Sequence, residues 1–460
     1  MKRLLSFLAF VFAVADVSAA AVVDRIVVRQ RWPWSEKTKV SYRITGVDAP
    51  VDLNVTFSSG GETLSADAFA TNFTGTVLGI CSSGEYSFEF DPAVVFGTAA
   101  IGELTVSLAP VASPYTKAQL TTSIYRILDL ENKTWEDLTA QDLFSNRYGT
   151  YETNYVTAFA PNWTSPKLTV RDCIIWTGVT NGPTYRTSKL ALRRIPARSY
   201  GAWTMGCDTD ANNTLVQRQV VLTNDYWMGV FMFTQDQLYR YMGSYGGGGW
   251  TYDHDYYGNH LHLPAMALNF ADIRGDTTVY IWPANGHAVA PSSCLGKMKA
   301  AFNGALAFDV ATEAQWEFAC RGGCAAYQYN GVASTDAFSI KDCAWTQYNT
   351  YTNATLTSND RVQTCVPKVV GLLKPNAFGL YDMIGDSYEW VLDRYQADYL
   401  PEGSEPYADP IGPSDATTYK NHVLRSRNYN NAGMHSAFRT QSSTGTKGGF
   451  RLCIQIPVGE

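Results

Sequence analysis

KPNAFGLYDMIGDSYEWVLDRY, residues Lys374 to Tyr395, is the most informative segment of this chain. It combines aromatic residues, glycines and four carboxylates, and its part GLYDMIGDSYEW, Gly379 to Trp390, follows neither a helical nor a strand period. Gly379 and Gly385 indicate turns in which the backbone takes a positive φ or is closely approached. The segment therefore predicts an ordered, irregular loop rather than a regular element.

Two carboxylates of this segment are candidate metal ligands. Asp386 and Glu389 lie three residues apart and are spaced to converge on one hard cation, while Tyr388 and Trp390 could separate that site from water. The alternative is that both carboxylates cap turns. We favour a cation site.

The composition excludes several classes of protein. A length of 460 residues predicts two or three domains. An apolar content of 45% excludes general disorder. The net charge is −6 and no basic run is present, so a surface that follows nucleic-acid phosphates is not expected.

The N-terminus resembles a bacterial secretion signal. Lys2 and Arg3 precede a short apolar run, and Val17-Ser18-Ala19 supplies small residues for cleavage. We expect residues 1–20 to be a signal peptide and the protein to be secreted or periplasmic; an uncleaved anchor or a buried strand is the alternative. No later segment reaches ~18 uninterrupted apolar residues, so no membrane span is expected.

Nine cysteines in an oxidising compartment predict some disulfide pairing. Cys343 and Cys365 bracket a loop and are the first candidates for a bridge. Cys320 and Cys324 lie one helical turn apart, which suits a packed pair as well as a bond. The other pairings stay open, and the odd count leaves at least one thiol free.

The N-terminal part of the chain is typical of a β domain. Residues 21–110 contain short alternating segments such as KVSYRITG, Lys39 to Gly46, separated by Ser- and Gly-rich turns. This pattern predicts a β-sandwich of the immunoglobulin-like kind, and a spacer role is favoured over a binding role. Residues 111–188 are expected to be a connecting β-rich region, with strands at Tyr125–Leu130 and Lys167–Gly178.

From Lys189 onward the pattern predicts an α+β domain that extends to residue 460. Thr234 with Gln237, and Thr312 with Gln315, form capping boxes that start helices. The second helix should run from Glu313 to about Arg321 and stop at the following glycines. We expect two helices against a small antiparallel sheet, with long ordered loops.

Several motifs of this domain, taken in order, resemble one known family. They are WTMG at Trp203–Gly206, DYWMGVFMFTQDQLYRYMG from Asp225, ATEAQWEFACRGG from Ala311, the segment quoted first, and Gly449-Phe450-Arg451. Together they resemble the formylglycine-generating enzyme family, also called the sulfatase-modifying factor family. The resemblance covers residues 189–460 and implies an elaborated C-type-lectin fold. It does not cover the N-terminal third.

The resemblance also raises the question of oxidase chemistry. The family's founding enzymes oxidise a sulfatase cysteine to formylglycine with molecular oxygen and copper, which two cysteines hold after an R-G-G-S-[WY] motif. Here the stretch reads RSRNYNNAGMHSAFRTQ, in which Arg425 and Tyr429 match but no cysteine follows before Cys453. Copper(I) favours thiolate ligands. We therefore expect no copper and no catalytic residue of this type.

The calcium site of the family implies a role for the residues already singled out. Family members bind calcium at G-N-x-W-E, which here reads Gly385-Asp386-Ser387-Tyr388-Glu389. Aspartate in place of asparagine keeps the side-chain oxygen and adds a charge that calcium tolerates. Asp386 and Glu389 are thus expected to bind a structural calcium ion.

A binding role is the preferred function. In relatives with this fold the equivalent edge displays ligand-binding side chains, and Tyr and Asn suit recognition. We expect a lectin-like face that binds a protein, peptide or glycan, or acts as a scaffold, through Arg425, Asn428, Asn430, Asn431 and His435. The alternative is a sulfatase-maturing oxidoreductase or a relative with altered metal chemistry.

A histidine-rich loop offers one further metal candidate. His254, His260 and His262 lie close together in the chain with Asp253 and Asp255. Such a set could bind a transition metal. A structural role for His262, which precedes Leu263-Pro264, is favoured over a metal site.

Overall fold

The computed structural model describes residues 20–460 except 31–33, 65–72, 98–100, 154–161, 170–171, 208–215, 245–261, 276–278, 334–335, 351–366, 399, 401–403, 430–433, 442–447 and 457–460. The chain divides into two compact units. The first comprises residues 1–120 with 144–147, and the second comprises residues 121–143 with 148–460. The predicted signal peptide lies outside the described residues, apart from its last position.

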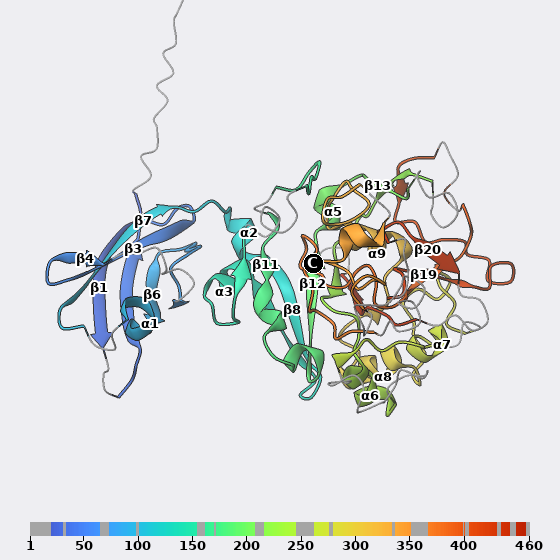
Figure 1. Cartoon of the computed structure of the whole chain (residues 1–460), viewed down its shortest axis with the longest axis horizontal. Helices are drawn as coiled ribbons and strands as arrows, with labels where there is room; N and C mark the ends of the chain where they lie inside the picture. The colour runs from blue at the N-terminus through green and yellow to red at the C-terminus, as the bar shows by residue number, and fades with distance from the viewer. Residues whose placement is uncertain are drawn as a thin grey trace, which may run out of the picture. The chain divides into compact units, whose positions relative to one another are not determined.

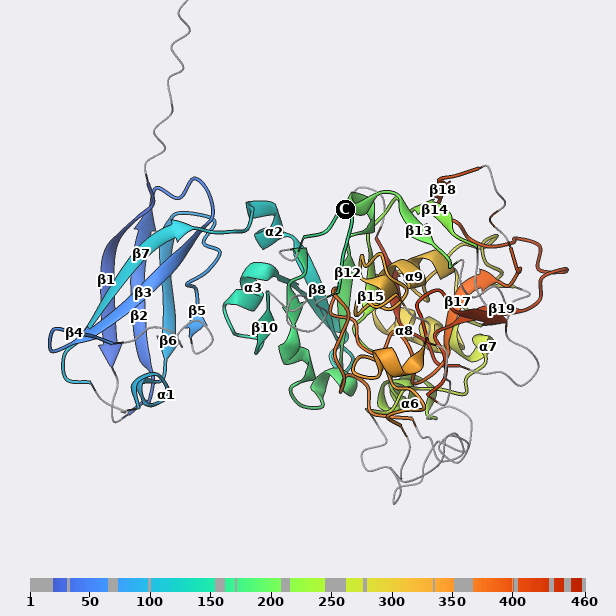
Figure 2. The same ribbon diagram turned by 45° about the horizontal axis from the view of Figure 1, so that its top comes forward.

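The first unit contains two antiparallel sheets (Figures 1 and 2). One has the order β1-β2-β6-β5 and the other β4-β3-β7. A single helical turn, α1 (Pro92–Phe96), follows β6. The strands are β1 (Val22–Gln30), β2 (Thr38–Thr45), β3 (Val51–Ser59), β4 (Glu62–Leu64), β5 (Thr74–Gly75), β6 (Gly84–Phe90) and β7 (Leu104–Ala112).

The alternation seen in the sequence explains how these strands pack. Along β2, Val40, Tyr42 and Ile44 are buried, whereas Arg43 and Thr45 between and after them are exposed. Successive side chains of a strand point to opposite faces, so this order gives one apolar face. Both sheets contribute to one hydrophobic core, with Phe57 from β3 and Phe88 from β6.

The second unit is built on a six-stranded antiparallel sheet of order β16-β21-β15-β12-β8-β9. Two of its strands come from the predicted connecting region, which therefore contributes to this sheet. The expected strand at Tyr125–Leu130 is present as β8. The strands are β8 (Ser123–Asp129), β9 (Thr134–Thr139), β12 (Lys189–Ile195), β15 (Tyr226–Gly229), β16 (Phe308–Asp309) and β21 (Cys453–Gln455).

The strand expected at Lys167–Gly178 is mostly absent. Only β11 (Ile175–Trp176) forms, and it pairs with β10 (Tyr151–Glu152). The carboxylate of Asp172 accepts hydrogen bonds from the backbone nitrogen and hydroxyl of Thr169, at 2.7 and 3.0 Å. Such local side-chain bonds stabilise a turn in competition with a strand.

Both predicted capping boxes start helices. Thr234 caps α6 (Gln235–Met242), and Thr312 caps α9 (Glu313–Arg321). Each helix ends at a left-handed glycine, Gly243 and Gly322. The helices α5 (Ala197–Tyr200), α7 (Phe270–Ile273) and α8 (Cys294–Ala301) were not predicted from the sequence. For α8, Ser293 is the cap but glycine stands at the third position, so the capping box is incomplete.

The remaining elements are short. Helix α2 (Lys117–Thr121) lies almost entirely in the first unit, and α3 (Ala140–Phe144) lies almost entirely in the second. Within the described part of the second unit, 3₁₀ turns lie at Thr177–Thr180, Thr184–Arg186 and Ala337–Ile340. The second unit also contains two three-stranded sheets. One consists of β13 (Trp203–Met205), β14 (Arg218–Val221) and β18 (Tyr407–Ala408), and the other of β17 (Glu389–Arg394), β19 (His422–Arg425) and β20 (Arg439–Gln441).

The first part of the segment, residues 374–388, is an irregular loop as expected, but its last part forms the strand β17, in which every residue is buried. Gly379 and Gly385 have φ angles of +77° and +89°, which confirms the expected turns. Gly385 also forms a bridge with Trp345. Among the described residues, no helix is long and apolar enough to cross a membrane.

We expect Gly385→Ala to destabilise the second unit by about 2 kcal/mol or more, because a Cβ there would lie 2.1 Å from the carbonyl oxygen of Trp345. Gly243→Ala is the matched control. Its φ is also positive, at +68°, but a Cβ would meet nothing within 4 Å, so a loss of about 1 kcal/mol is expected. Urea unfolding of both variants measures the difference, and equal losses would contradict the packing argument.

Candidate functional site

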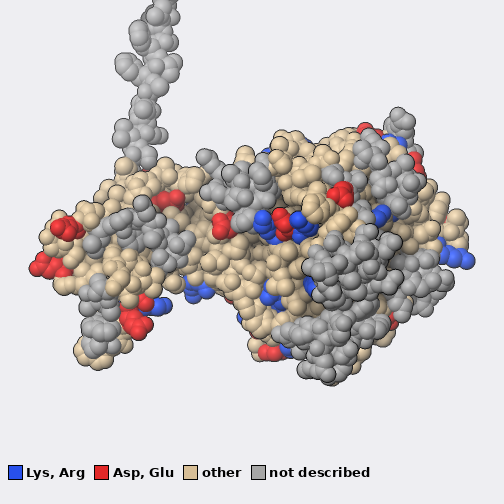
Figure 3. All heavy atoms as spheres, in the orientation of Figure 1, with Lys and Arg blue, Asp and Glu red and all other residues tan. Residues whose placement is uncertain are grey.

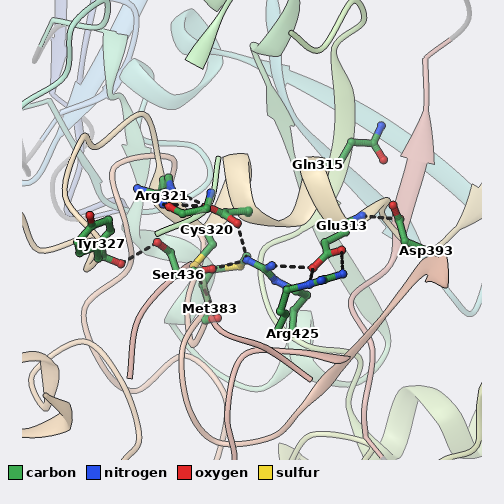
Figure 4. Close-up of polar contacts among 12 residues, drawn as sticks. Glu313, Gln315, Cys320, Arg321, Tyr327, Met383, Asp393, Arg425 and Ser436 are labelled. Atoms are coloured by element: carbon green, nitrogen blue, oxygen red, sulfur yellow. Dashed lines mark hydrogen bonds and ion pairs between the residues drawn. The ribbon is translucent and has the colours of Figure 1, made fainter. Parts of the chain in front are cut away.

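A buried cluster of ion pairs lies where helix α9 meets strands β19 and β20 (Figure 4). Arg425 on β19 donates to Glu313 and to Glu317 on α9, at 2.8 Å in both cases. It also donates to the carbonyl oxygen of Ser436 at 2.5 Å. The side chains of all three charged residues are 0% exposed.

Two further arginines bind the same glutamates. Arg439 binds Glu313 through two nitrogens, at 2.7 and 2.9 Å. Arg321 binds Glu317 at 2.8 Å. Burial alone would raise the pKa of Glu317, but the charges of Arg321 and Arg425 outweigh it and hold this pKa below its ordinary value. Buried carboxylates are tolerated when they are paired in this way.

One family-like motif is tied directly to this cluster. The backbone nitrogen of Gly206, at the end of WTMG, donates to Glu317 at 2.9 Å, and its carbonyl oxygen accepts from Arg321 at 2.8 Å. Helix α9 is buried on almost every side, so its acidic residues have no access to water. The cluster therefore fixes the position of α9.

Glu389 is committed to a second buried ion pair. Arg451 donates to Glu389 at 2.9 Å and 3.3 Å, and the indole nitrogen of Trp316 donates to it at 2.8 Å. Arg451 also binds four backbone carbonyls, including that of Gly229. Both carboxylate oxygens of Glu389 thus have donors, and a cation would have to compete with Arg451 for them.

Asp386 is placed differently. It is fully buried with a φ of +60°, and one carboxylate oxygen accepts from the backbone nitrogen of Lys368 at 3.0 Å. Its other oxygen, Oδ2, has no hydrogen-bond partner among the described residues. Asp382 has one such oxygen as well, Oδ1, while its Oδ2 accepts from Gly371 at 2.6 Å.

Burial and nearby negative charges disfavour the charged forms of these two aspartates. Burial raises the pKa of Asp382 to about 6. Burial and the charge of Asp382 raise the pKa of Asp386 well above its ordinary value. A divalent cation would relieve both effects. No group of three or more His, Cys, Asp or Glu residues arranged to hold a metal occurs within the described part of the chain.

The structure does not bring the five predicted recognition residues together on a surface. Arg425 and His435 are buried, with 0% and 1% exposure. Asn428 is half-buried, and its side-chain oxygen accepts from the backbone nitrogen of Tyr429. Asn430 and Asn431 lie outside the described residues. Next to Asn428, the guanidinium of Arg427 stacks on Phe438 at 3.8 Å from the ring centroid.

The described cysteines of the second unit are buried free thiols. Cys453 on β21 is fully buried, and burial raises the pKa of its thiol well above the ordinary value. Cys320 and Cys324 are both free thiols, so the packed alternative holds for them. Cys343 is also a free thiol, and Cys365 lies outside the described residues, so the structure gives the expected bridge no support.

The histidine-rich loop falls mostly outside the described residues, including His254 and His260. His262 is buried, and burial lowers the pKa of its imidazole. Its backbone oxygen accepts from Val370, as expected for a structural position.

Sequence reasoning missed the acidic residues of the buried cluster. A signal was present, because Glu313 and Glu317 lie four residues apart, on one side of a helix that also carries Ala314, Trp316, Phe318, Ala319 and Cys320. Two carboxylates among so many apolar residues indicate that they need buried partners. The sequence does not show which arginines supply them.

Comparison with known proteins supports the family resemblance. The family model described as "Sulfatase-modifying factor enzyme 1-like domain" matches residues 197–456. A formylglycine-generating enzyme of Streptomyces coelicolor is 32% identical over 119 residues, 26% of this chain and 35% of that protein. A serine/threonine-protein kinase pkn1 of Chlamydia pneumoniae is 32% identical over 103 residues, 22% of this chain and 13% of that protein. The matches thus span about a third or less of either relative.

Two solved structures have similar chains. Treponema denticola variable protein 1 has a TM-score of 0.42 and 19% identity, over 58% of this chain and 96% of that one. PvdO from Pseudomonas aeruginosa has a TM-score of 0.41 and 18% identity, over 58% and 94%.

We expect Arg425→Ala to reduce the free energy of unfolding by about 3–5 kcal/mol, because it leaves two buried carboxylates short of a partner. Arg240→Ala is the control in the same unit. Its pairs with Asp236 and Glu131 are partly exposed, so a loss below about 1 kcal/mol is expected. Chemical denaturation compares the two, and a small loss for Arg425→Ala would argue for a role on the surface instead.

Proposed function

This chain belongs to the sulfatase-modifying factor family, and we propose that it uses the family fold for binding rather than for copper-dependent oxidation. The observation that carries this proposal is the composition of the stretch Arg425–Gln441. It contains no thiol, and its first residue, Arg425, forms buried ion pairs with two glutamates. Copper(I) requires soft ligands such as thiolates, so these residues do not fit the metal.

The proposed binding surface is the loop that follows β19. Arg427 and Asn428 are its half-buried described residues, and the stacking of Arg427 on Phe438 holds a charged and an aromatic group side by side. Arginine, asparagine and aromatic side chains are common in recognition surfaces. The residues beneath the loop are rigid because they are buried and paired. We propose that a protein, peptide or glycan binds there, in a secreted or periplasmic setting.

The oxidase alternative is supported by the sequence similarity to a formylglycine-generating enzyme. The two proposals differ in one measurable product. We expect that the purified full chain, incubated with a sulfatase-derived cysteine peptide, copper and oxygen, forms no aldehyde detectable by mass spectrometry. The Streptomyces coelicolor relative serves as the positive control. Aldehyde formation by this chain would overturn the proposed binding-only role.

A positive test of binding uses the same protein on peptide and glycan arrays. The expected result is retention of the full chain on a defined set of spots, and its loss in the double variant Arg427→Ala, Asn428→Ala. Arg198→Ala is the control, because Arg198 is exposed on the short helix α5 in the same unit. Unchanged retention by the double variant would place recognition elsewhere.

We also propose that a structural calcium ion binds at Asp386. The support is that Asp386 and Asp382 each keep one buried carboxylate oxygen without a partner among the described residues, because calcium prefers carboxylate oxygens. Glu389 fits less well than the sequence suggested, since Arg451 and Trp316 already occupy its oxygens. Bound calcium would supply the positive charge that Asp382 and Asp386 lack.

On this proposal, chelation lowers the melting temperature of the second unit. A ligand at about 100 times its Kd adds about 2.7 kcal/mol to stability. We expect Asp386→Ala to abolish the chelator effect, whereas Glu389→Gln lowers stability equally with and without calcium because it breaks the pair with Arg451. The exposed Asp398→Ala is the control and should keep the full chelator effect.

Calorimetry in calcium and in chelator measures these four proteins. The calcium effect should grow with rising pH, because protons and calcium compete for carboxylates whose pKa values are raised. A wild-type protein that is indifferent to chelation would rule out an occupied site.

A further inference from the structure

We propose that a pocket beside His287 and Asp309 is a second ligand site, which binds a small neutral polyhydroxylated molecule such as a monosaccharide unit. The pocket has a volume of about 310 Å³ and lies within the second unit. It is distinct from the loop after β19 and from the aspartates of the calcium proposal. Neither the motifs of the sequence nor the proposed function accounts for it.

The imidazole of His287 is held in a defined orientation at this pocket. Its Nδ1 lies 2.8 Å from Oδ2 of Asp309, a fully buried carboxylate at the end of β16. Because a carboxylate accepts, Nδ1 carries the proton, and in the neutral ring the lone pair is on Nε2. The side chain of His287 is 32% exposed, and within the described structure no protein group bonds to Nε2.

Arg274 holds both members of this pair in place. It donates to the carboxylate of Asp309 at 2.9 Å and 3.3 Å and is itself 1% exposed. Its other nitrogens donate to the carbonyl oxygens of Tyr280 and Gly286, at 2.5 and 2.6 Å. These two residues lie in the loop that carries His287, so one buried arginine fixes the loop and the acid together. A site that is organised before binding pays little conformational entropy.

The charges around the pocket point to a neutral ligand. No lysine or arginine is among its described lining residues, which argues against an anion. Its one carboxylate, Asp409, already accepts from the backbone nitrogen and the hydroxyl of Thr223, at 2.9 and 2.5 Å, which argues against a cation. A single imidazole does not make a metal site, and no cluster of metal ligands is found among the described residues.

The remaining lining suits a ligand with hydroxyl groups on one side and C–H groups on the other. Nε2 of His287 can accept from a hydroxyl, and Asn224 can accept through its amide oxygen and donate the hydrogen that it does not give to Thr223. Gln315 keeps one amide hydrogen to donate, and the amide oxygen of Gln455 keeps one lone pair to accept. Gln315 and Gln455 bond to each other at 2.9 Å, which fixes both amides.

Apolar side chains form the other part of the wall. Trp282 packs against the ring of His287, with the two centroids 4.8 Å apart. Leu222 and Ile411 also line the pocket. Mainly apolar walls with a few fixed polar groups are the usual form of a small-molecule site, and this volume is at the small end of the range.

Histidine-selective NMR of the full chain tests the proposal, since the protein has only six histidines. His287→Gln identifies the His287 imidazole signal by its loss. The probes are a panel of neutral monosaccharides, with choline and zinc ions as the cationic and metal alternatives. We expect at least one monosaccharide to shift the His287 signal saturably, with a Kd on the order of millimolar.

Ile411→Trp fills the pocket and should abolish that shift, and it leaves the pair of His287 with Asp309 intact because Ile411 is 37% exposed. Leu372→Trp is the matched control at an exposed position outside the pocket and should keep the shift. The proposal is overturned if no monosaccharide shifts His287, if only choline or zinc does so, or if the shift survives Ile411→Trp.

Discussion

The bond between Arg425 and the two glutamates of α9 is the contact around which the family domain is organised. It joins a strand near the end of the chain to a helix more than a hundred residues earlier, and all three side chains are fully buried. Charges removed from water are costly unless every one is paired. Arg321 and Arg439 supply the additional positive charge, so these contacts hold α9, β19, β20 and Gly206, which follows β13, together.

The features that the sequence predicted correctly are those encoded within a few residues. Thr312 and Gln315 specify the start of α9, and Gly322 specifies its end. The positive φ of Gly385 follows from the same kind of local logic. The prediction of a strand at Lys167–Gly178 was mostly wrong, and the reason is also local. The hydrogen bond from Thr169 to Asp172 favours a turn, and the apolar residues of the segment do not reveal that bond. On the surface drawn in Figure 3, charged side chains form small mixed groups, in keeping with the composition.

The candidate site was harder to predict because its residues depend on distant partners. Spacing alone made Asp386 and Glu389 equivalent, yet Arg451 takes Glu389 while Asp386 keeps an oxygen without a partner. In the same way Arg425 looked like a surface residue because it precedes a polar stretch. Only the three-dimensional structure shows that Glu313 and Glu317 face it. The role of a side chain that depends on a partner far away in the sequence can be assigned only when the three-dimensional structure is known.

The separation between the buried pairs and the loop beyond them bears on how this domain can serve recognition. Arg425, Arg439 and Arg451 are buried and paired, whereas Arg427 and Asn428 after β19 are half-buried. Substitutions away from buried, paired groups usually change stability by less than about 0.5 kcal/mol. These two side chains can therefore change without loss of the scaffold, whereas the three buried arginines cannot. A rigid base of buried ion pairs under a tolerant loop is the physical arrangement that a binding module requires.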